Sequence, residues 1–339
     1  MRIGIIGAGN IARLHVQGLE RSGHELVVVS DTDAGRAEAL ARPRGARATC
    51  DVDEFLAERL DLVTVTVPNI LHHQVATRVV NAGHAVLCEK PMTRSAADSL
   101  ALLELVRRVG KPFFTGYMKR SHPTVQKFVD YAKRIGTPRS GLMRAFHPFP
   151  LKEWDRIASE LARDPAALRT TVYNDGAFVN SGSHMLDLLL LTAGPVRRVL
   201  ASRFQRRPGC VTDTMAHALL EMASGATITV ECGWLPLTGV GRREDGWDEV
   251  LELRGDAGQA RLFTTWWDRP DHEAPVADLW LQSTTTRESF NGGSVDYFAK
   301  QYELIELALR GEPTPLATAE DGYRVDQLID DVFAAACDE

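Results

Sequence analysis

Apolar residues in the first third of the chain fall into short runs, and stretches with helical spacing separate these runs. The runs cover Ile3 to Ile6, Leu26 to Ser30, Leu62 to Val67, Ala85 to Cys88 and Pro112 to Thr115. Short β-branched runs that alternate with helices are typical of right-handed crossovers and a parallel sheet. We therefore predict a doubly wound Rossmann domain with a parallel sheet over residues 1–118.

The pattern changes from about Arg139, after which longer runs alternate apolar and polar positions. These runs cover Gly141 to Phe149, Val196 to Phe204, Ala216 to Glu221, Ala226 to Trp234 and Glu249 to Arg254. Consecutive strands without helices between them indicate a mostly antiparallel sheet. We predict a second, α+β domain with a large open sheet over residues 119–339. Its last helices, Tyr297 to Arg310 and Glu320 to Ala336, can pack back on the first domain.

Charge and composition narrow the classes of partner. The 339 residues carry a formal net charge of −6, and no basic block occurs. This excludes a nucleic-acid footprint and a patch for an anionic membrane, so we expect a small-molecule partner. No apolar run approaches the roughly 18 residues of a membrane helix, and the first residues lack the regions of a signal peptide. We expect a cytoplasmic protein without a membrane partner.

The five cysteines form no Cys-x-x-Cys pair. An odd number of cysteines without such pairs argues against a disulfide framework and a structural zinc site, and it fits a reducing compartment. We predict no metal site. Cys88 occupies an apolar strand position, where a buried and inert thiol is expected.

A glycine motif, Gly7-Ala8-Gly9-Asn10-Ile11-Ala12, follows the first apolar run and opens a helix. Its first glycine permits a tight turn, and its second lets the backbone approach a pyrophosphate at the positive end of the helix. We predict a dinucleotide contact here, made by Gly7, Gly9, Asn10 and Ile11.

Asp31 follows the second run, about twenty residues after the glycines, where an acidic residue binds the ribose hydroxyls of adenosine. A carboxylate there repels a 2′-phosphate, so NAD is favoured over NADP. The alternative is that Asp31 caps the next helix, and Arg36 is expected on a solvated face. Residues after later strands complete the predicted cofactor site: Pro68, Asn69, His72, Glu89 and Lys90.

Two further features suggest chemistry. A buried run ends in Glu89-Lys90-Pro91, which places a lysine at the crevice edge of the sheet, although a solvated loop lysine is the simple alternative. Downstream, Asn180, His184 and Asp187 stand four and three apart and share one face of a helix that starts near Ser181. Such a polar face is costly to bury. A satisfied core histidine would be the interpretation of His184 alone, but its neighbours favour a site.

Together these motifs resemble the Gfo/Idh/MocA family of glucose-fructose oxidoreductase, inositol dehydrogenase and rhizopine catabolism proteins. The matching segments are the glycine motif, Thr66 to Asn69 with His72, Glu89 to Pro91, and Gly182 to Asp187. The resemblance covers nearly the whole chain. It implies a Rossmann domain followed by a domain with an open sheet that often mediates dimers or tetramers. It also implies reversible hydride transfer between a nicotinamide cofactor and a hydroxyl-bearing carbon. We expect a homodimer or homotetramer through the C-terminal sheet.

By this resemblance Lys90 matches the catalytic lysine of the family and His184 its proton-transferring histidine. The family usually carries an aspartate four residues before that histidine, where this chain has Asn180. An asparagine can hold a substrate hydroxyl, but it cannot pair with an imidazolium, so more of the proton chemistry falls to Lys90. Our hypothesis is that Asp175 or Asp187 supplies compensating charge.

Substrate contacts are predicted at Lys90, Lys119, His147, Asn180, His184 and Trp234. A solvated face is an equal alternative for Lys119, and a core position is the alternative for Trp234. Residues 152–174 are poorly periodic and are expected to form a substrate-covering loop. Acidic residues there would suit an amino sugar or aminocyclitol, as in aminoglycosides.

The sequence thus predicts an NAD-dependent dehydrogenase that oxidises a secondary hydroxyl of a sugar, amino sugar or cyclitol to a ketone. In this mechanism His184 takes the hydroxyl proton and Lys90 polarises the same oxygen. Two alternatives stay open. One is an NAD-dependent glycosidase that uses transient oxidation. The other is a non-catalytic regulatory protein that senses the dinucleotide, which the presence of both Lys90 and His184 disfavours.

Overall fold

Two compact units make up the chain in the computed structural model. The first comprises Met1–Ser121 and Asp296–Asp326, and the second comprises His122–Val295 and Gln327–Glu339. The structure describes residues 1–148, 176–207, 212–235, 239, 241–242, 244–265 and 274–336. The predicted division into domains 1–118 and 119–339 stays a prediction.

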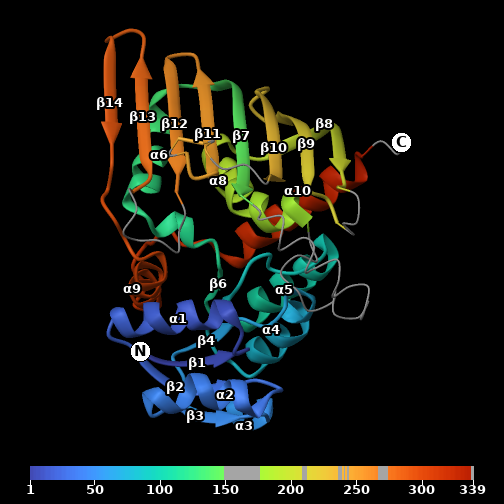
Figure 1. The fold of residues 1–339 in the computed structure, drawn as a ribbon, viewed down its shortest axis with the longest axis vertical. Helices are drawn as coiled ribbons and strands as arrows, with labels where there is room; N and C mark the ends of the chain where they lie inside the picture. The colour runs from blue at the N-terminus through green and yellow to red at the C-terminus, as the bar shows by residue number, and fades with distance from the viewer. Residues whose placement is uncertain are drawn as a thin grey trace. The chain divides into compact units, whose positions relative to one another are not determined.

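A six-stranded parallel sheet forms the centre of the first unit, with the strand order β3-β2-β1-β4-β5-β6 (Figure 1). This order is that of a dinucleotide-binding doubly wound sheet. The strands are β1 (Arg2–Ile6), β2 (Glu25–Ser30), β3 (Arg47–Thr49), β4 (Leu62–Val65), β5 (Val86–Cys88) and β6 (Phe113–Thr115). Our prediction missed only β3, whose three residues are too few to show a period.

Each face of this sheet has its own hydrophobic core. In β4, Leu62 belongs to one core, while Val63 and Val65 belong to the other. The first core packs against α1 (Asn10–Arg21), α2 (Ala34–Ala41) and α9 (Tyr297–Leu309). The second packs against α3 (Val52–Leu56), α4 (His72–Asn81) and α5 (Ala96–Val109). Short 3-10 helices lie at η1 (Arg42–Arg44), η2 (Asn69–Leu71) and η3 (Met118–Ser121).

The carboxyl ends of the strands are tied together by backbone hydrogen bonds. Gly7 donates to the carbonyl of Ser30 (2.7 Å), and Thr66 donates to the carbonyl of Ile6 (2.8 Å). Glu89 donates to the carbonyl of Val65 (3.0 Å). The loops that carry the glycine motif and the Glu-Lys-Pro motif therefore start from one edge of one sheet.

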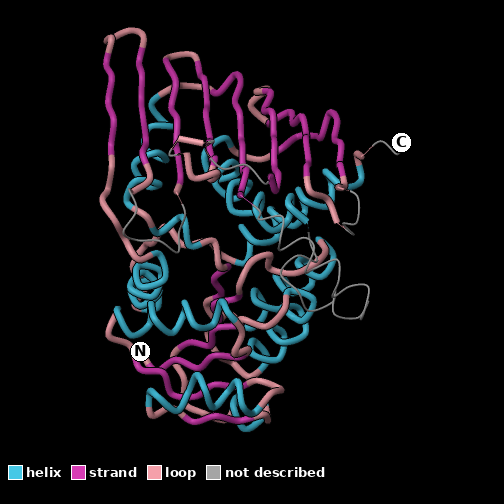
Figure 2. The backbone as a smooth tube through the Cα atoms, in the orientation of Figure 1, coloured by secondary structure: helices cyan, strands magenta, loops and turns pink. Residues whose placement is uncertain are grey.

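The second unit contains an eight-stranded sheet among its described residues, in the order β14-β13-β12-β11-β7-β10-β9-β8. Its strands are labelled in Figure 1 and drawn in magenta in Figure 2. Only the pair β7 and β10 is parallel in this part of the chain. The strands are β7 (Pro138–Pro148), β8 (Val196–Gln205), β9 (Met215–Met222), β10 (Thr227–Leu235), β11 (Asp248–Gly255), β12 (Gly258–Thr264), β13 (Val276–Leu281) and β14 (Thr286–Phe290). The predicted fold class is confirmed, although the strands β12 to β14 were not predicted.

Helices α6 (Pro123–Arg134) and α8 (Ser183–Ala193) pack on this sheet. A π-helix, Phe178–Gly182, precedes α8, so the helical stretch begins earlier than the predicted start near Ser181. A side chain at Gly182 would place its Cβ 2.8 Å from the Sγ of Cys232 on β10, which explains the glycine. The last helix, α10 (Ala319–Ala334), runs from the residues of the first unit into those of the second.

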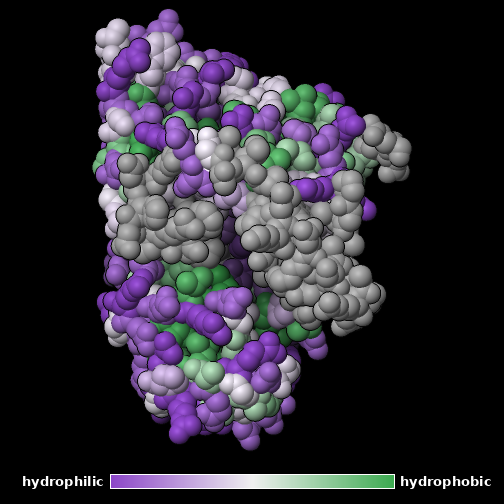
Figure 3. All heavy atoms as spheres, in the orientation of Figure 1, coloured by the Kyte–Doolittle hydropathy of each residue, from purple (hydrophilic) through white to green (hydrophobic). Residues whose placement is uncertain are grey.

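The surface over β13 and β14 is mainly hydrophilic in the view of Figure 3. On β14, Thr286–Phe290, exposed positions alternate with half-buried ones. No helix within the described residues combines the length and the apolar character needed to span a membrane.

Candidate functional site

The glycine motif has the backbone geometry that a dinucleotide loop needs. Gly7 has φ +100°, and a Cβ there would lie 2.7 Å from the backbone of Thr66 and Val67. Nothing lies within 4 Å of a Cβ at Gly9, the N-cap of α1, so the space above it is open. No side chain caps α1, and its first turn holds no acidic residue. The free N–H groups of this helix end therefore suit an anionic group.

Asp31 lies beside this loop, at the end of β2. Its Oδ2 accepts the N–H of Ala8 (2.7 Å), and its Oδ1 accepts the N–H of Asp33 (2.9 Å). Asp33, not Asp31, is the N-cap of α2, so the capping alternative was wrong. The guanidinium of Arg36 lies 3.4 Å from Oδ1 of Asp31, while its side chain is largely exposed.

The Lys90 loop follows β5 and is held at several points. Oε2 of Glu89 accepts the N–H of Lys90 (3.1 Å), and the Lys90–Pro91 peptide bond is cis. Further along, Oδ2 of Asp326 accepts the N–H of Thr93 (2.9 Å). Glu89 and Asp326 are both buried. The backbone on both sides of Lys90 is thus fixed by buried carboxylates.

His72, a predicted cofactor contact, lies in the core of this loop region. Its Nδ1 is 2.7 Å from the carbonyl oxygen of Pro91, and its Nε2 is 2.9 Å from that of Val67. Burial lowers the pKa of His72, against the opposing effect of these carbonyls. Only one of the two carbonyls receives a proton from a neutral ring. The imidazole joins two loops, and its cofactor contact stays a prediction.

Lys119 lies in η3 and is almost fully buried, with 1% of its surface exposed. The solvated-face alternative was therefore wrong. Its contact with a substrate stays a prediction, as do the cofactor contacts of Pro68 and Asn69, which begin η2. The prediction that Cys88 is buried is confirmed, and burial raises the pKa of this thiol well above its ordinary value.

In the second unit, the structure places Asn180 in the π-helix and His184 and Asp187 in α8. His184 and Asp187 are buried, and Asn180 is half-buried. Their roles stay predictions. The proposed alternative charge Asp175 and the predicted covering loop 152–174 lie outside the described residues, as do Phe149, Cys210 and Cys337.

Two predicted substrate contacts, His147 and Trp234, meet in a hydrogen-bonded chain. Nε1 of Trp234 donates to Oγ of Ser181 (2.8 Å), which lies 2.8 Å from Nδ1 of His147. Nε2 of His147 lies 2.9 Å from Oε1 of Glu249, whose Oε2 accepts the hydroxyl of Thr264. Because an indole N–H can only donate, the Ser181 hydroxyl is left to donate to His147. Trp234 is buried, with 5% of its surface exposed, as the core alternative predicts. Its contact with a substrate stays a prediction.

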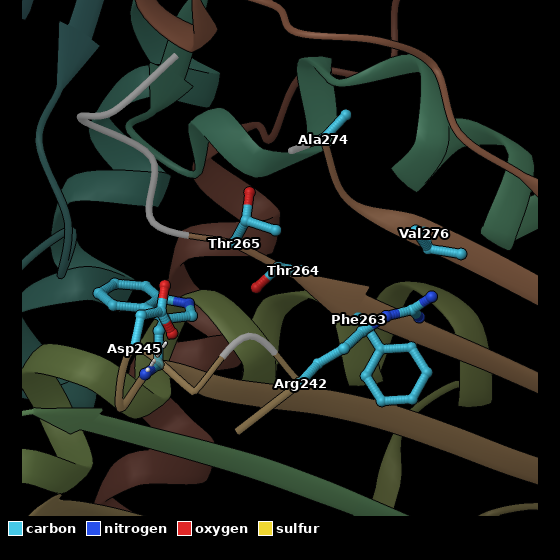
Figure 4. A pocket seen from close by; sticks show the side chains of 8 residues that line it. Arg242, Asp245, Phe263, Thr264, Thr265, Ala274 and Val276 are labelled. Carbon is cyan, nitrogen blue, oxygen red and sulfur yellow. Dashed lines mark hydrogen bonds between the residues drawn. The ribbon is translucent and has the colours of Figure 1, made fainter. Parts of the chain in front are cut away.

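A pocket lies next to these hydrogen-bonded side chains (Figure 4). Trp247, which lines it, stacks on His147 with ring centroids 3.7 Å apart, and Thr264 lines it as well. Arg242 lies over the ring of Phe263 at 4.6 Å. The other lining residues are Asp245, Thr265, Ala274 and Val276. The pocket thus offers a cation, a carboxylate and hydroxyl groups beside apolar walls.

The sequence interpretation missed several buried polar residues. One group is His15, which pairs with Glu89 and contacts the hydroxyl of Tyr302. Another is Glu249, which pairs with His147. A third is Asp213, which accepts the N–H of Phe178 (2.9 Å) at the start of the π-helix. The structure also explains Gly176, because a Cβ there would collide with the carboxylate of Asp213. Within the described residues, no group of three or more His, Cys, Asp or Glu is arranged to hold a metal ion.

Comparison with known families supports the reading of these motifs. The family model described as "Oxidoreductase family, NAD-binding Rossmann fold" (GFO_IDH_MocA) matches residues 1–117, and the model described as "GFO/IDH/MocA C-terminal domain" matches residues 124–278. The chain belongs to the Gfo/Idh/MocA oxidoreductase family. The predicted resemblance and the prediction of an NAD(P)-dependent oxidoreductase are thereby confirmed.

Curated Gfo/Idh/MocA relatives match at different lengths. D-xylose 1-dehydrogenase (NADP(+)) 2 of Haloferax volcanii is 27% identical over 99% of this chain and 97% of its own length. Inositol 2-dehydrogenase 1 of Saccharopolyspora erythraea is 28% identical over 95% of this chain and 90% of its own. Inositol 2-dehydrogenase of Leifsonia xyli is 37% identical, but the match spans 35% of this chain and 37% of that protein.

Solved structures confirm the fold. KijD10, a 3-ketoreductase from Actinomadura kijaniata crystallised with NADP and TDP-benzene, has a TM-score of 0.76 at 21% identity and covers 99% of this chain and 98% of its own. The WlbA dehydrogenase of Bordetella pertussis, in complex with NADH and UDP-GlcNAcA, has a TM-score of 0.77 at 20% identity and covers 99% and 95%.

Proposed function

We propose that this protein is an NAD-dependent dehydrogenase that oxidises a secondary hydroxyl of a sugar, amino sugar or cyclitol to a ketone. The observation that carries the proposal lies in the first unit. Lys90 follows β5 at the same sheet edge as the glycine motif and Asp31, on a backbone held by Glu89 and Asp326. Relatives named for the oxidation of xylose and inositol support the substrate class.

The residues of the first unit fit a nicotinamide dinucleotide. The open space above Gly9 and the uncapped start of α1 suit the pyrophosphate. Each oxygen of the Asp31 carboxylate accepts one backbone N–H, and a carboxylate oxygen can accept a further hydrogen bond, here from a ribose hydroxyl. The loop of Gly7 and Gly9 and the carboxylate of Asp31 would hold NAD, which would supply the acceptor for the hydride of the substrate carbon.

The protein's own part is to bind and orient the alcohol and to remove its proton. In this proposal His184 accepts the hydroxyl proton, and Lys90 donates a hydrogen bond to the same oxygen. An ammonium group stabilises the negative charge that develops on that oxygen as the proton leaves. Asn180 would hold a neighbouring substrate hydroxyl through its amide.

A panel of inositols, pentoses, hexoses, amino sugars and nucleotide sugars with NAD and with NADP tests the proposal. We expect net formation of reduced nicotinamide, measured by absorbance, with at least one member. Cleavage of a glycoside without net reduction would favour the NAD-dependent glycosidase instead. Tight dinucleotide binding with no turnover of either kind would favour a regulatory protein.

Two variants test the cofactor preference. Asp31→Ala should lower kcat/KM with NAD relative to NADP by roughly tenfold, because it removes the ribose acceptor and the repulsion of a 2′-phosphate. Arg36→Ala should move the ratio the other way, since an arginine at this place can bind that phosphate. A wild type that prefers NADP would overturn the NAD assignment while leaving the dehydrogenase proposal in place.

A further inference from the structure

A buried histidine–glutamate pair in the first unit links Glu89, the residue before Lys90, to helix α1. Nε2 of His15, on α1, lies 2.8 Å from Oε1 of Glu89. Nδ1 of the same ring lies 3.1 Å from the hydroxyl of Tyr302, on α9, and that hydroxyl lies 3.0 Å from Oγ1 of Thr64. The side chain of His15 is fully buried and that of Glu89 is 9% exposed.

The donors and acceptors of this chain fit one direction. Burial raises the pKa of Glu89, but the hydrogen bond from His15 and the positive charge of Lys90 outweigh this effect, so the pKa is lowered and the group stays a carboxylate. A carboxylate only accepts, so Nε2 of His15 donates to it. Burial raises the pKa of Tyr302, which keeps its proton and donates it to Nδ1.

The chain ends at the backbone of Lys90. While Oε1 of Glu89 faces His15, Oε2 accepts the N–H of Lys90 (3.1 Å). The carboxylate also fills the space beside Gly116, where a Cβ would lie 3.0 Å from Oε1. Glu89 therefore has little freedom to turn away from the Lys90 amide.

Filling a core with buried polar groups of this kind costs free energy that apolar side chains would not. Removing a carboxylate from water costs several kcal/mol, and an apolar residue of similar volume is often as stable. His15 also packs edge-on against the ring of Phe298, 4.8 Å away, so apolar filling would suit the place. What an apolar residue cannot supply is the acceptor for the N–H of Lys90.

We propose that Glu89, held by His15 and Tyr302, is a positioning residue that fixes the backbone of Lys90 for the reaction. The inference rests on the proposed role of Lys90 in the dehydrogenase. Neither His15 nor Tyr302 needs to touch the substrate, because both act through Glu89.

Three single variants test the proposal: Glu89→Gln, His15→Gln and Tyr302→Phe. Glu89→Gln keeps the shape of the side chain, but its amide places an N–H₂ group against one of two donors, His15 or the N–H of Lys90, and a neutral oxygen against the other. Because this loosens the backbone of Lys90, the variant should lower kcat about 10-fold to 100-fold. KM and the NADH dissociation constant, measured by fluorescence, should stay within about twofold. Tyr302→Phe removes only the hydroxyl and should lower kcat less than Glu89→Gln.

The double variant His15→Gln with Glu89→Gln should lose little more kcat than Glu89→Gln alone, since the two residues act as one unit. Glu252→Gln is the control for loss of a buried carboxylate, because Glu252 pairs with Arg261 on the second sheet. Each assay is run well below the melting temperature of the variant, so that a loss of stability alone does not lower kcat.

Unchanged kcat in Glu89→Gln, with only a lower melting temperature, would overturn the inference, and so would an NADH affinity that falls in step with kcat. Failure of the proposed function is recognised separately, because Lys90→Ala would then keep its turnover or no alcohol would be oxidised at all.

Discussion

Each unit of this protein holds a hydroxyl–imidazole–carboxylate chain, and the two chains differ in where they end. In both, Nε2 of a histidine faces a glutamate and Nδ1 faces a hydroxyl. The distances are 2.8 and 3.1 Å at His15, and 2.9 and 2.8 Å at His147. The chemistry of the two groups is thus nearly the same.

The surroundings separate them. His15 is enclosed by the first core, and its glutamate bonds to the backbone of Lys90. The side chain of His147 is 18% exposed, and its ring stacks on Trp247, a wall of the pocket in Figure 4. The comparison teaches that one motif can fix a backbone in one place and stiffen a pocket wall in another. We expect changes in the first chain to act on kcat and changes in the second to act on KM.

The largest effects are expected at the two proposed reacting side chains, one in each unit. Lys90→Ala and His184→Ala should each lower kcat about 100-fold to 10,000-fold, because each removes a group that handles the hydroxyl proton or the charge it leaves. NADH affinity should change little, and a fluorescence titration checks this. A His184→Ala variant with near-normal turnover would contradict the role of His184 and leave the proton chemistry to Lys90.

Glu249→Gln gives the direct counterpart of Glu89→Gln. It loosens His147 and the Trp247 wall without touching the Lys90 loop, so KM should rise roughly 3-fold to 10-fold while kcat stays within about twofold. Steady-state kinetics with the best substrate of the panel measure both constants. If Glu249→Gln instead lowers kcat as strongly as Glu89→Gln, both hydrogen-bonded series act on the reacting groups, and the second does not act on substrate binding alone.

Local signals in the sequence were enough for the glycine motif, the Lys90 run and the helix of His184, because each lies within about a dozen consecutive residues. The histidine–glutamate chains were not predictable in this way. His15 meets Glu89 at a separation of 74 residues and Tyr302 at 287. Single histidines and tyrosines on apolar helices look like ordinary core positions until the fold brings their partners to them.

A contact between distant segments also explains why the π-helix before His184 was not predicted. The sequence places Asn180 four residues before His184, but the backbone there is a π-helix, which spaces side chains differently from an α-helix. Asp213, from the segment before β9, accepts the N–H of Phe178 at this point. A contact from a distant segment decides the local geometry, and no pattern within residues 176–187 contains it.

Asp213 also provides the smallest predicted effect, one on stability. Burial raises its pKa to about 6 from the ordinary 3.8, against the pull of the backbone N–H bonds. A carboxyl whose pKa is raised in the folded chain stabilises the fold fully at a pH below its pKa in the unfolded chain. This stabilisation is lost as the pH rises through the folded pKa of about 6. Asp213→Asn removes the ionisation. Its free energy of unfolding relative to the wild type should therefore increase by about 1 kcal/mol between about pH 5 and pH 8.

Urea unfolding at the two pH values measures this difference, with Asp33→Asn at the exposed cap of α2 as the control for losing a carboxylate from a helix start. A difference independent of pH would mean that Asp213 ionises as easily in the folded chain as in the unfolded one. The π-helix before His184 would then be held by a charged cap, as α2 is by Asp33.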